Sequence, residues 1–167
     1  DIPYLRLKIE NVVKRSRFLP GAHNFKALRH ILEKYPRDEV LQISEDDLFK
    51  HAISILRLQE RPRIALYTRT DPFGRYISAL VYVPRERHET RLRLKIQQIL
   101  ELELNGKCTS FQVTQDDSPL ARVIFWIDIN HLDKAPGFDP KHIEIKLQAA
   151  GQVWSEQLRA ALEIGRA

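Results

Sequence analysis

The 167-residue chain is 43% hydrophobic and 29% charged, which is typical of an ordinary folded protein and excludes a disordered chain. No stretch approaches eighteen consecutive apolar residues, and no apolar segment follows a basic start, so the pattern excludes a membrane-spanning helix and a secretory signal. The single cysteine, Cys108, excludes a disulfide framework and indicates a reducing compartment. We therefore expect a cytoplasmic protein.

The net charge of +5, from 27 basic and 22 acidic residues, raises the question of a nucleic-acid partner. Surfaces that follow phosphates concentrate one sign of charge. Here the signs alternate, as in the stretch 85–103, where four glutamates are interspersed among five basic residues. We therefore expect a solvated surface of mixed charge and no nucleic-acid partner. The chain also begins with Asp1 and contains no methionine, so we expect a fragment of a longer protein.

Residues 1–61 are predicted to form three helices that flank or link a neighbouring module. The first helix follows Pro3 and ends near Arg17, because apolar residues repeat there at helical spacing. The second spans 24–35, with Asn24 as its N-terminal cap and a proline after it. The third starts at Ser44, whose hydroxyl can accept a hydrogen bond from the amide of Asp47.

The apolar period changes from 3.6 to 2 after residue 62, which indicates β-strands. Strands are predicted over 63–70 and 76–83, joined by the turn sequence DPFG. A helix is predicted over 90–104, ended by Asn105 and Gly106. Two more strands follow, over 108–114 and 121–129, and then a long helix over 142–164 that Gly151 weakly interrupts.

This order of elements predicts an α+β fold of the ferredoxin-like or ACT-like type. It is a two-layer sandwich with a four-stranded antiparallel sheet in a permuted ββαββα order. We expect 62–130 to form the sheet and its helix. We expect 131–167 to be a C-terminal helix that completes the module or leaves it.

The sequence lacks the residue patterns that catalysis, cofactor binding or metal binding would require. The six glycines are too far apart for the G-x-G-x-x-G turn of a dinucleotide site or for a phosphate loop. The six histidines form no H-x-H or H-x-x-x-H pair, and one cysteine cannot build a thiolate zinc site. The acidic pairs Asp46-Asp47 and Asp116-Asp117 fall at a helix start and a turn, where aspartate is common for conformational reasons. We expect no catalytic, cofactor-binding or metal-binding residue.

Five arginines near predicted strand ends are the candidate effector or interface residues. They are Arg69, Arg75, Arg85, Arg87 and Arg122. A guanidinium can hold a carboxylate through two parallel hydrogen bonds, so these residues could hold an amino-acid effector. We expect them instead to form ordinary ion pairs between domains.

Several runs of sequence resemble a known family. They are YPRDE at 35–39, LQERPR at 58–63, RTDPFGRYIS at 69–78, LVYVPRER at 80–87, T-x-L-R at 90–93 and SPLARV-x-F at 118–125. Together they resemble the N-terminal, non-catalytic region of the large bacterial NAD-specific glutamate dehydrogenases. The resemblance extends discontinuously over about residues 3–130.

The resemblance implies a cytoplasmic, homo-oligomeric parent enzyme that oxidatively deaminates L-glutamate to 2-oxoglutarate with NAD. It also implies ACT-type modules, which bind amino acids or mediate subunit contacts. The family's catalytic lysine and glycine-rich cofactor turn match no position here, so NAD belongs to the parent and no cofactor to this chain. ACT domains that bind amino acids usually have a glycine between the first strand and helix, where this chain has PRER at 84–87.

The leading hypothesis is a non-catalytic regulatory and assembly module whose partners are neighbouring domains and subunits. An amino-acid effector domain of the same enzyme is the alternative. A third class is an RNA-binding sheet, with Tyr67, Tyr76, Tyr82 and Trp126 as stacking aromatics. Against RNA binding, no RNP-like run occurs, and most of these aromatics could face the helices.

Overall fold

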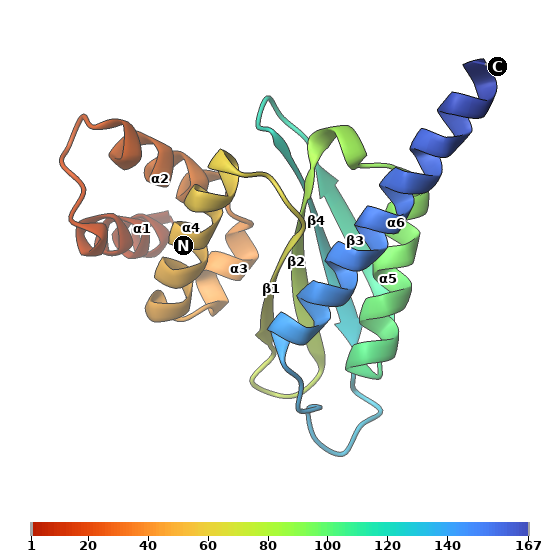
Figure 1. The fold of residues 1–167 in the computed structure, drawn as a ribbon. Helices are drawn as coiled ribbons and strands as arrows, with labels where there is room; N and C mark the ends of the chain where they lie inside the picture. The colour runs from red at the N-terminus through yellow and green to blue at the C-terminus, as the bar shows by residue number, and fades with distance from the viewer. Residues whose placement is uncertain (1, 167) are drawn as a thin grey trace. The chain divides into compact units, whose positions relative to one another are not determined.

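The chain divides into two compact units, Asp1–Arg61 and Pro62–Ala167. A computed structural model describes residues 2–166 (Figure 1). Each unit has its own helices and its own buried apolar residues.

The first unit contains four helices in its described part, one more than the sequence predicts. They are α1 (Ile2–Ser16), α2 (His23–Lys34), α3 (Arg37–Gln42) and α4 (Glu45–Glu60). The additional helix is α3, which has six residues and buries Glu39 and Val40. Such a short helix cannot show a repeated apolar stripe, so the periodicity of the sequence did not reveal it.

The cap at the start of α4 is confirmed, and the cap predicted for α2 is wrong. Ser44 Oγ accepts a hydrogen bond from the amide of Asp47 at 3.1 Å. By contrast, α2 begins at His23, and its N-cap residue Ala22 makes no side-chain capping bond. Asn24 lies inside the first turn of α2, two residues after the N-cap position.

A buried lysine connects α1 to the end of α3. Lys8 is 8% exposed, and its Nζ donates a hydrogen bond to the carbonyl of Ile43, the C-cap residue of α3. An ammonium group suits this position because the last carbonyls of a helix lack partners and carry partial negative charge. Burial lowers the pKa of Lys8, and Glu45 opposes that shift.

The second unit is the predicted α+β sandwich. Its elements are β1 (Ala65–Thr70), β2 (Tyr76–Pro84), the short 3₁₀ helix η1 (Arg85–Arg87), α5 (Thr90–Leu104), β3 (Lys107–Thr114), β4 (Leu120–Asp128) and α6 (Pro140–Arg166). The strand order is β1-β2-β4-β3, and every neighbouring pair is antiparallel. This is the order that results when the last strand of a ferredoxin-like βαββαβ fold is moved to the front. The fold class is confirmed.

One face of the sheet forms the core with α5 and α6 (Figure 1). The sheet contributes alternate residues of each central strand, as in the cross-strand pairs Ile77–Ile127 and Ala79–Phe125. From α5, Leu92, Ile96, Leu100 and Leu104 pack into this core at steps of four residues. The helix ends at Asn105, whose φ of 52° places it in the left-handed region.

The first half of α6 covers the outer edge of β1. Glu144 Oε2 accepts a hydrogen bond from the backbone amide of Leu66 at 2.9 Å, and Gln148 Nε2 donates to the carbonyl of Ile64 at 2.9 Å. Gly151 permits this close approach, because a Cβ there would lie 2.4 Å from Ile64 Cδ1. The expected interruption at Gly151 is wrong, since α6 continues through it without a break.

Candidate functional site

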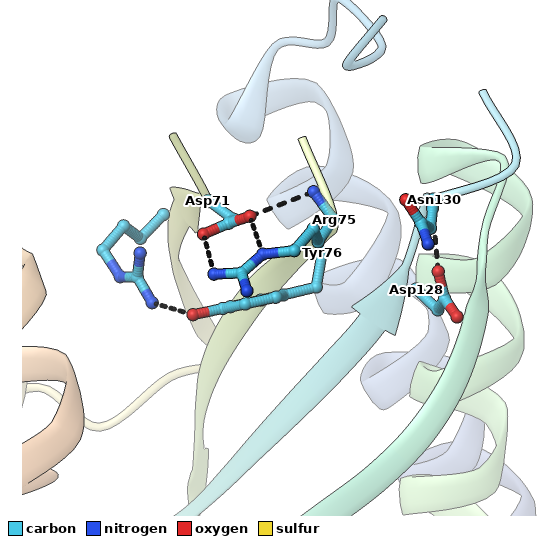
Figure 2. A network of polar contacts seen from close by, with 6 residues as sticks. Asp71, Arg75, Tyr76, Asp128 and Asn130 are labelled. Atoms are coloured by element: carbon cyan, nitrogen blue, oxygen red, sulfur yellow. Dashed lines mark hydrogen bonds and ion pairs between the residues drawn. The ribbon is translucent and has the colours of Figure 1, made fainter. Parts of the chain in front are cut away.

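The turn between β1 and β2 contains a buried carboxylate paired with one of the predicted arginines (Figure 2). Asp71 is 2% exposed and accepts three hydrogen bonds from Arg75: from Nε at 2.8 Å, from Nη2 at 3.0 Å and from the backbone amide at 3.0 Å. The turn itself is closed by backbone bonds from Gly74 to Asp71 and from Asp71 to Tyr76. The carboxylate therefore fixes both the turn and the guanidinium.

The pKa shifts of Asp71 and Arg75 agree with this geometry. The hydrogen bonds from Arg75 lower the pKa of Asp71 to about 2, and its burial only partly opposes them. In return, Asp71 raises the pKa of Arg75. Asp71 occupies Nε and one hydrogen of Nη2, so a second carboxylate could pair with Arg75 only through the remaining hydrogens of Nη1 and Nη2.

Arg69 lies beside this turn and is also engaged within the unit. Its Nη2 donates to the hydroxyl of Tyr76 at 3.1 Å, and its guanidinium lies 5.5 Å from the centroid of the Tyr76 ring. Arg75 and Tyr76 border a shallow hollow of about 480 Å³, which Trp126 and Asp128 also line. In Figure 2, Asp128 and Asn130 lie across from the turn, joined by a hydrogen bond of 2.8 Å from the Asn130 amide to the Asp128 carboxylate.

The remaining three arginines lie at the other end of the sheet. Arg85 and Arg87 follow the last residue of β2 and are exposed, and Arg122 pairs across the ladder with Tyr82. Arg75 precedes the first residue of β2, and Arg69, on β1, pairs across the ladder with Ser78. At about 3.3 Å per residue, β2 separates Arg75 from Arg85 and Arg87 by roughly 25 Å, and it separates the levels of Arg69 and Arg122 by roughly 13 Å. The five arginines therefore do not converge on one site.

The four aromatics considered for RNA binding lie on the sheet face opposite α5 and α6, which corrects the suggestion that most could face the helices. Ladder pairing places Tyr76, Tyr82 and Trp126 out of phase with the core residues of β2 and β4. Tyr67 and Tyr82 are buried and pack edge to face, with ring centroids 5.9 Å apart. Burial raises the pKa of Tyr82, and the Arg122 guanidinium opposes that shift. Only Tyr76 and Trp126 remain half-buried.

Sequence reasoning treated Asp71 only as a turn residue and did not include it in the site. The missed signal is the Asp-x-x-x-Arg spacing across a turn that contains Pro72 and Gly74. Within residues 2–166, no group of three or more His, Cys, Asp or Glu side chains is placed to hold a metal ion. In the same range, no helix is long and apolar enough to cross a membrane.

Glycines are absent from the strand-to-helix connection where a dinucleotide would need them. Between β2 and α5 the chain passes through Pro84, η1 and Glu89. A pyrophosphate is normally bound by glycine-rich backbone at the N-terminus of such a helix. The residues present at this connection do not fit NAD.

Two family models match the chain, one for each structural unit. The model described as glutamate dehydrogenase, helical motif 1, matches residues 2–61. The model described as glutamate dehydrogenase, ACT2 domain, matches residues 65–155. The second match ends in the middle of α6.

Curated relatives named NAD-specific glutamate dehydrogenase align with almost the whole chain. The protein from Pseudomonas aeruginosa is 38% identical over 156 residues, and the one from Halomonas elongata is 38% identical over 158 residues. The protein from Mycobacterium tuberculosis is 25% identical over 172 residues. These alignments cover 93%, 95% and 96% of this chain, respectively, but 10% of each relative.

The chain thus spans about a tenth of the length of the curated relatives it matches. The four-helix unit corresponds to helical motif 1, and the ferredoxin-like sandwich corresponds to ACT2. The resemblance seen in the sequence is confirmed on both units. The chain belongs to the NAD-specific glutamate dehydrogenase family, of which it carries helical motif 1 and the ACT2 domain.

Proposed function

We propose that this chain is a non-catalytic assembly module of a large NAD-dependent glutamate dehydrogenase. The parent enzyme converts L-glutamate, NAD and water to 2-oxoglutarate, ammonium and NADH. The names of the relatives support this reaction. NAD is bound elsewhere in the parent, and the partners of this module are neighbouring domains and subunits of a cytoplasmic homo-oligomer.

The exposed apolar side of α6 is the observation that carries the assembly role. Ile143 and Leu147, in the first half of the helix, are buried in the core. The same helical side continues through the half-buried Trp154 to Leu158 and Leu162, which are 45% and 58% exposed. Gln152, Glu156, Arg159 and Glu163 lie together on one polar side of this second half, while Val153 and Ile164 are further exposed apolar residues outside that side.

A helix with this pattern requires a partner surface. The 27 residues of α6 extend for about 40 Å at 1.5 Å per residue, and the second half continues past the end of α5 (Figure 1). Helical segments gain most of their stability from packing of the apolar side. Neighbouring parts of the parent enzyme are the surface that we expect to cover Leu158 and Leu162.

Assembly is favoured over effector sensing at the sheet because two of the five arginines already have partners within the unit and the others lie elsewhere. Arg75 is held bidentately by Asp71, and Arg69 is bonded to Tyr76. Arg85 and Arg87 follow the last residue of β2, and Arg122 on β4 pairs with Tyr82 near that end. We propose that these five residues serve internal and interface contacts.

The experiment compares full-length parent enzymes by light scattering and by glutamate kinetics. Replacing Leu158 and Leu162 by serine is expected to reduce the oligomer size or to dissociate the enzyme, because the substitutions remove apolar contact area from the interface. The matched control replaces Glu156 and Arg159, on the polar side of the same helix, and should leave the oligomer unchanged. An unchanged oligomer in the leucine variant would contradict the assembly role.

A second measurement tests the non-catalytic role of the chain itself. The 167-residue chain, incubated with L-glutamate and NAD, is expected to produce no NADH. Any turnover above the protein-free rate would overturn the proposal.

A further inference from the structure

The helical unit contains a hollow that the assembly role does not use. It lies among α1, α2 and α3, has a volume of about 300 Å³ and is lined entirely by residues of the first unit. Ligand sites of proteins begin at about this volume, so the hollow suits a small metabolite rather than a nucleotide.

The floor of the hollow is apolar and well packed. Leu32, Tyr35 and Val40 line it and are 1%, 4% and 2% exposed, respectively. Tyr35 is also held in place, because its hydroxyl lies 3.3 Å from Nδ1 of His51 on α4. Leu5 and Ile9 of α1 complete the apolar wall. A ligand bound here gains by covering the partly exposed Leu5 and Ile9 with an apolar group, because the floor itself is already almost inaccessible to water.

The rim of the hollow carries unpaired charges of both signs. One pair is satisfied, since Arg29 Nη2 lies 2.7 Å from Glu10 Oε1. Arg6, Glu33 and Arg37 also line the hollow, and within residues 2–166 their side chains make no hydrogen bond or ion pair. Two guanidinium groups attract a carboxylate, and one free carboxylate attracts an ammonium group.

The combination of these features selects the class of ligand. A dicarboxylate would place negative charge near Glu33, and a simple amine would leave both free arginines without a partner. A zwitterion with an apolar side chain satisfies the two signs of charge and the floor together. We propose that the hollow binds a free apolar α-amino acid, with its carboxylate held by Arg6 and Arg37 and its ammonium group by Glu33.

This proposal does not depend on the assembly role of α6. The hollow lies in the part that matches helical motif 1, outside the ACT2 match. It therefore places amino-acid binding in the helical unit and not on the sheet. An unchanged oligomer in the leucine variant would contradict the assembly role but not amino-acid binding in the hollow. Absence of amino-acid binding would likewise leave the assembly role untouched.

The test is calorimetric titration of the 167-residue chain with L-leucine, L-valine and L-methionine, together with two truncated analogues of leucine. 4-Methylpentanoate lacks the ammonium group, and 3-methylbutylamine lacks the carboxylate. At least one of the amino acids is expected to bind. If L-leucine binds, each analogue should bind about tenfold to a hundredfold more weakly, because one charge-assisted contact is lost. Absence of binding by all three amino acids, or equal binding of leucine and both analogues, would overturn the proposal.

Variants locate the site. Glu33→Gln and Arg37→Gln change exposed side chains, so the fold should be retained, which circular dichroism checks. Each is expected to weaken amino-acid binding about tenfold or more. Arg57→Gln, on the exposed surface of α4 and outside the hollow, is the matched control and should bind like the unmodified chain. Binding that is unaffected by the two rim variants would show that the ligand binds elsewhere and would also overturn the proposal.

Discussion

Asp71 is the residue on which the β1–β2 turn depends. A carboxylate that is almost inaccessible to water is costly unless it is paired and hydrogen-bonded. Here Arg75 provides the countercharge and three donors, and only the aspartate is buried, since the Arg75 side chain is 58% exposed. The arginine head therefore remains partly hydrated, which reduces the desolvation cost of the pair.

We predict that Asp71→Ala lowers the free energy of unfolding by about 1–3 kcal/mol, because it removes hydrogen bonds to a charged group. The loss should depend on pH. The pKa of Asp71 is about 2 in the folded chain, below the ordinary value of 3.8, so its contribution is complete above the ordinary pKa and is lost as pH falls toward 2. Urea unfolding between pH 7 and pH 2.5 measures both effects.

The control for this prediction is Asp133→Ala, which changes an exposed loop aspartate and should be nearly neutral. The difference in stability between Asp71→Ala and the unmodified chain should shrink on acidification. A difference that stays constant from pH 7 to pH 2.5 would contradict the ion-pair explanation.

His51 is expected to make the helical unit sensitive to mild acid. Burial lowers its pKa below the ordinary 6.5, and the carboxylates of Asp47 and Glu39 only partly oppose that effect. The unfolded chain therefore binds a proton at a higher pH than the folded chain. The contribution of neutral His51 to the free energy of unfolding is complete above pH 6.5 and falls as pH drops below it. Unfolding measured at pH 7.5 and 5.5 should show this loss.

His51→Gln should reduce that pH dependence, whereas His131→Gln, in an exposed loop, should not change it. Equal pH slopes for the unmodified chain and the His51 variant would show that another group is responsible.

At the scale of the elements, the connection from α5 to β3 depends on Gly106. A Cβ at this position would lie 2.6 Å from the carbonyl oxygen of Asp128 and 2.6 Å from Ile127 Cγ2, so β4 leaves no room for a side chain. We predict that Gly106→Ala lowers the free energy of unfolding by about 1–3 kcal/mol, the usual cost of overpacking. Gly137→Ala is the matched control, because nothing lies within 4 Å of its Cβ position, and it should change stability by less than about 0.5 kcal/mol.

Elements that show a long apolar repeat or a side-chain cap could be predicted from the sequence, and elements without either feature could not. The bounds of α5 agree with the prediction because four apolar residues repeat at steps of four. The start of α4 was found because a serine cap is a local contact. In contrast, α3 is too short to show a period, and the start of α2 has no side-chain cap to mark it.

At the scale of the whole molecule, the second unit has a complete core of its own. Residues from β1, β2, β4, α5 and α6 form one buried cluster that includes Phe125, Leu100 and Leu147. We predict that residues 62–167, expressed alone, unfold in one cooperative transition. Urea denaturation followed by circular dichroism measures this, and a gradual change without a transition would show that the unit needs further chain to fold.

The four strands, the longer helices and the fold class could be predicted from the sequence alone. Burial of one side of a helix or strand is a local pattern that the spacing of apolar residues records. Short antiparallel strands on either side of a helix then leave few topologies open, and the permuted ferredoxin-like order is one of them. The family resemblance could also be recognised from sequence alone, because it rests on contiguous runs.

Which side chains meet could be seen only once the elements were packed together. The positions of the five arginines along the sheet follow from the length of β2 and the register of its ladders. The contacts of Glu144 and Gln148 with the backbone of β1 join positions about eighty residues apart. The hollow of the helical unit requires α3, which the periodicity did not show. Contacts of this kind depend on how elements pack, and a one-dimensional pattern of burial does not specify that packing.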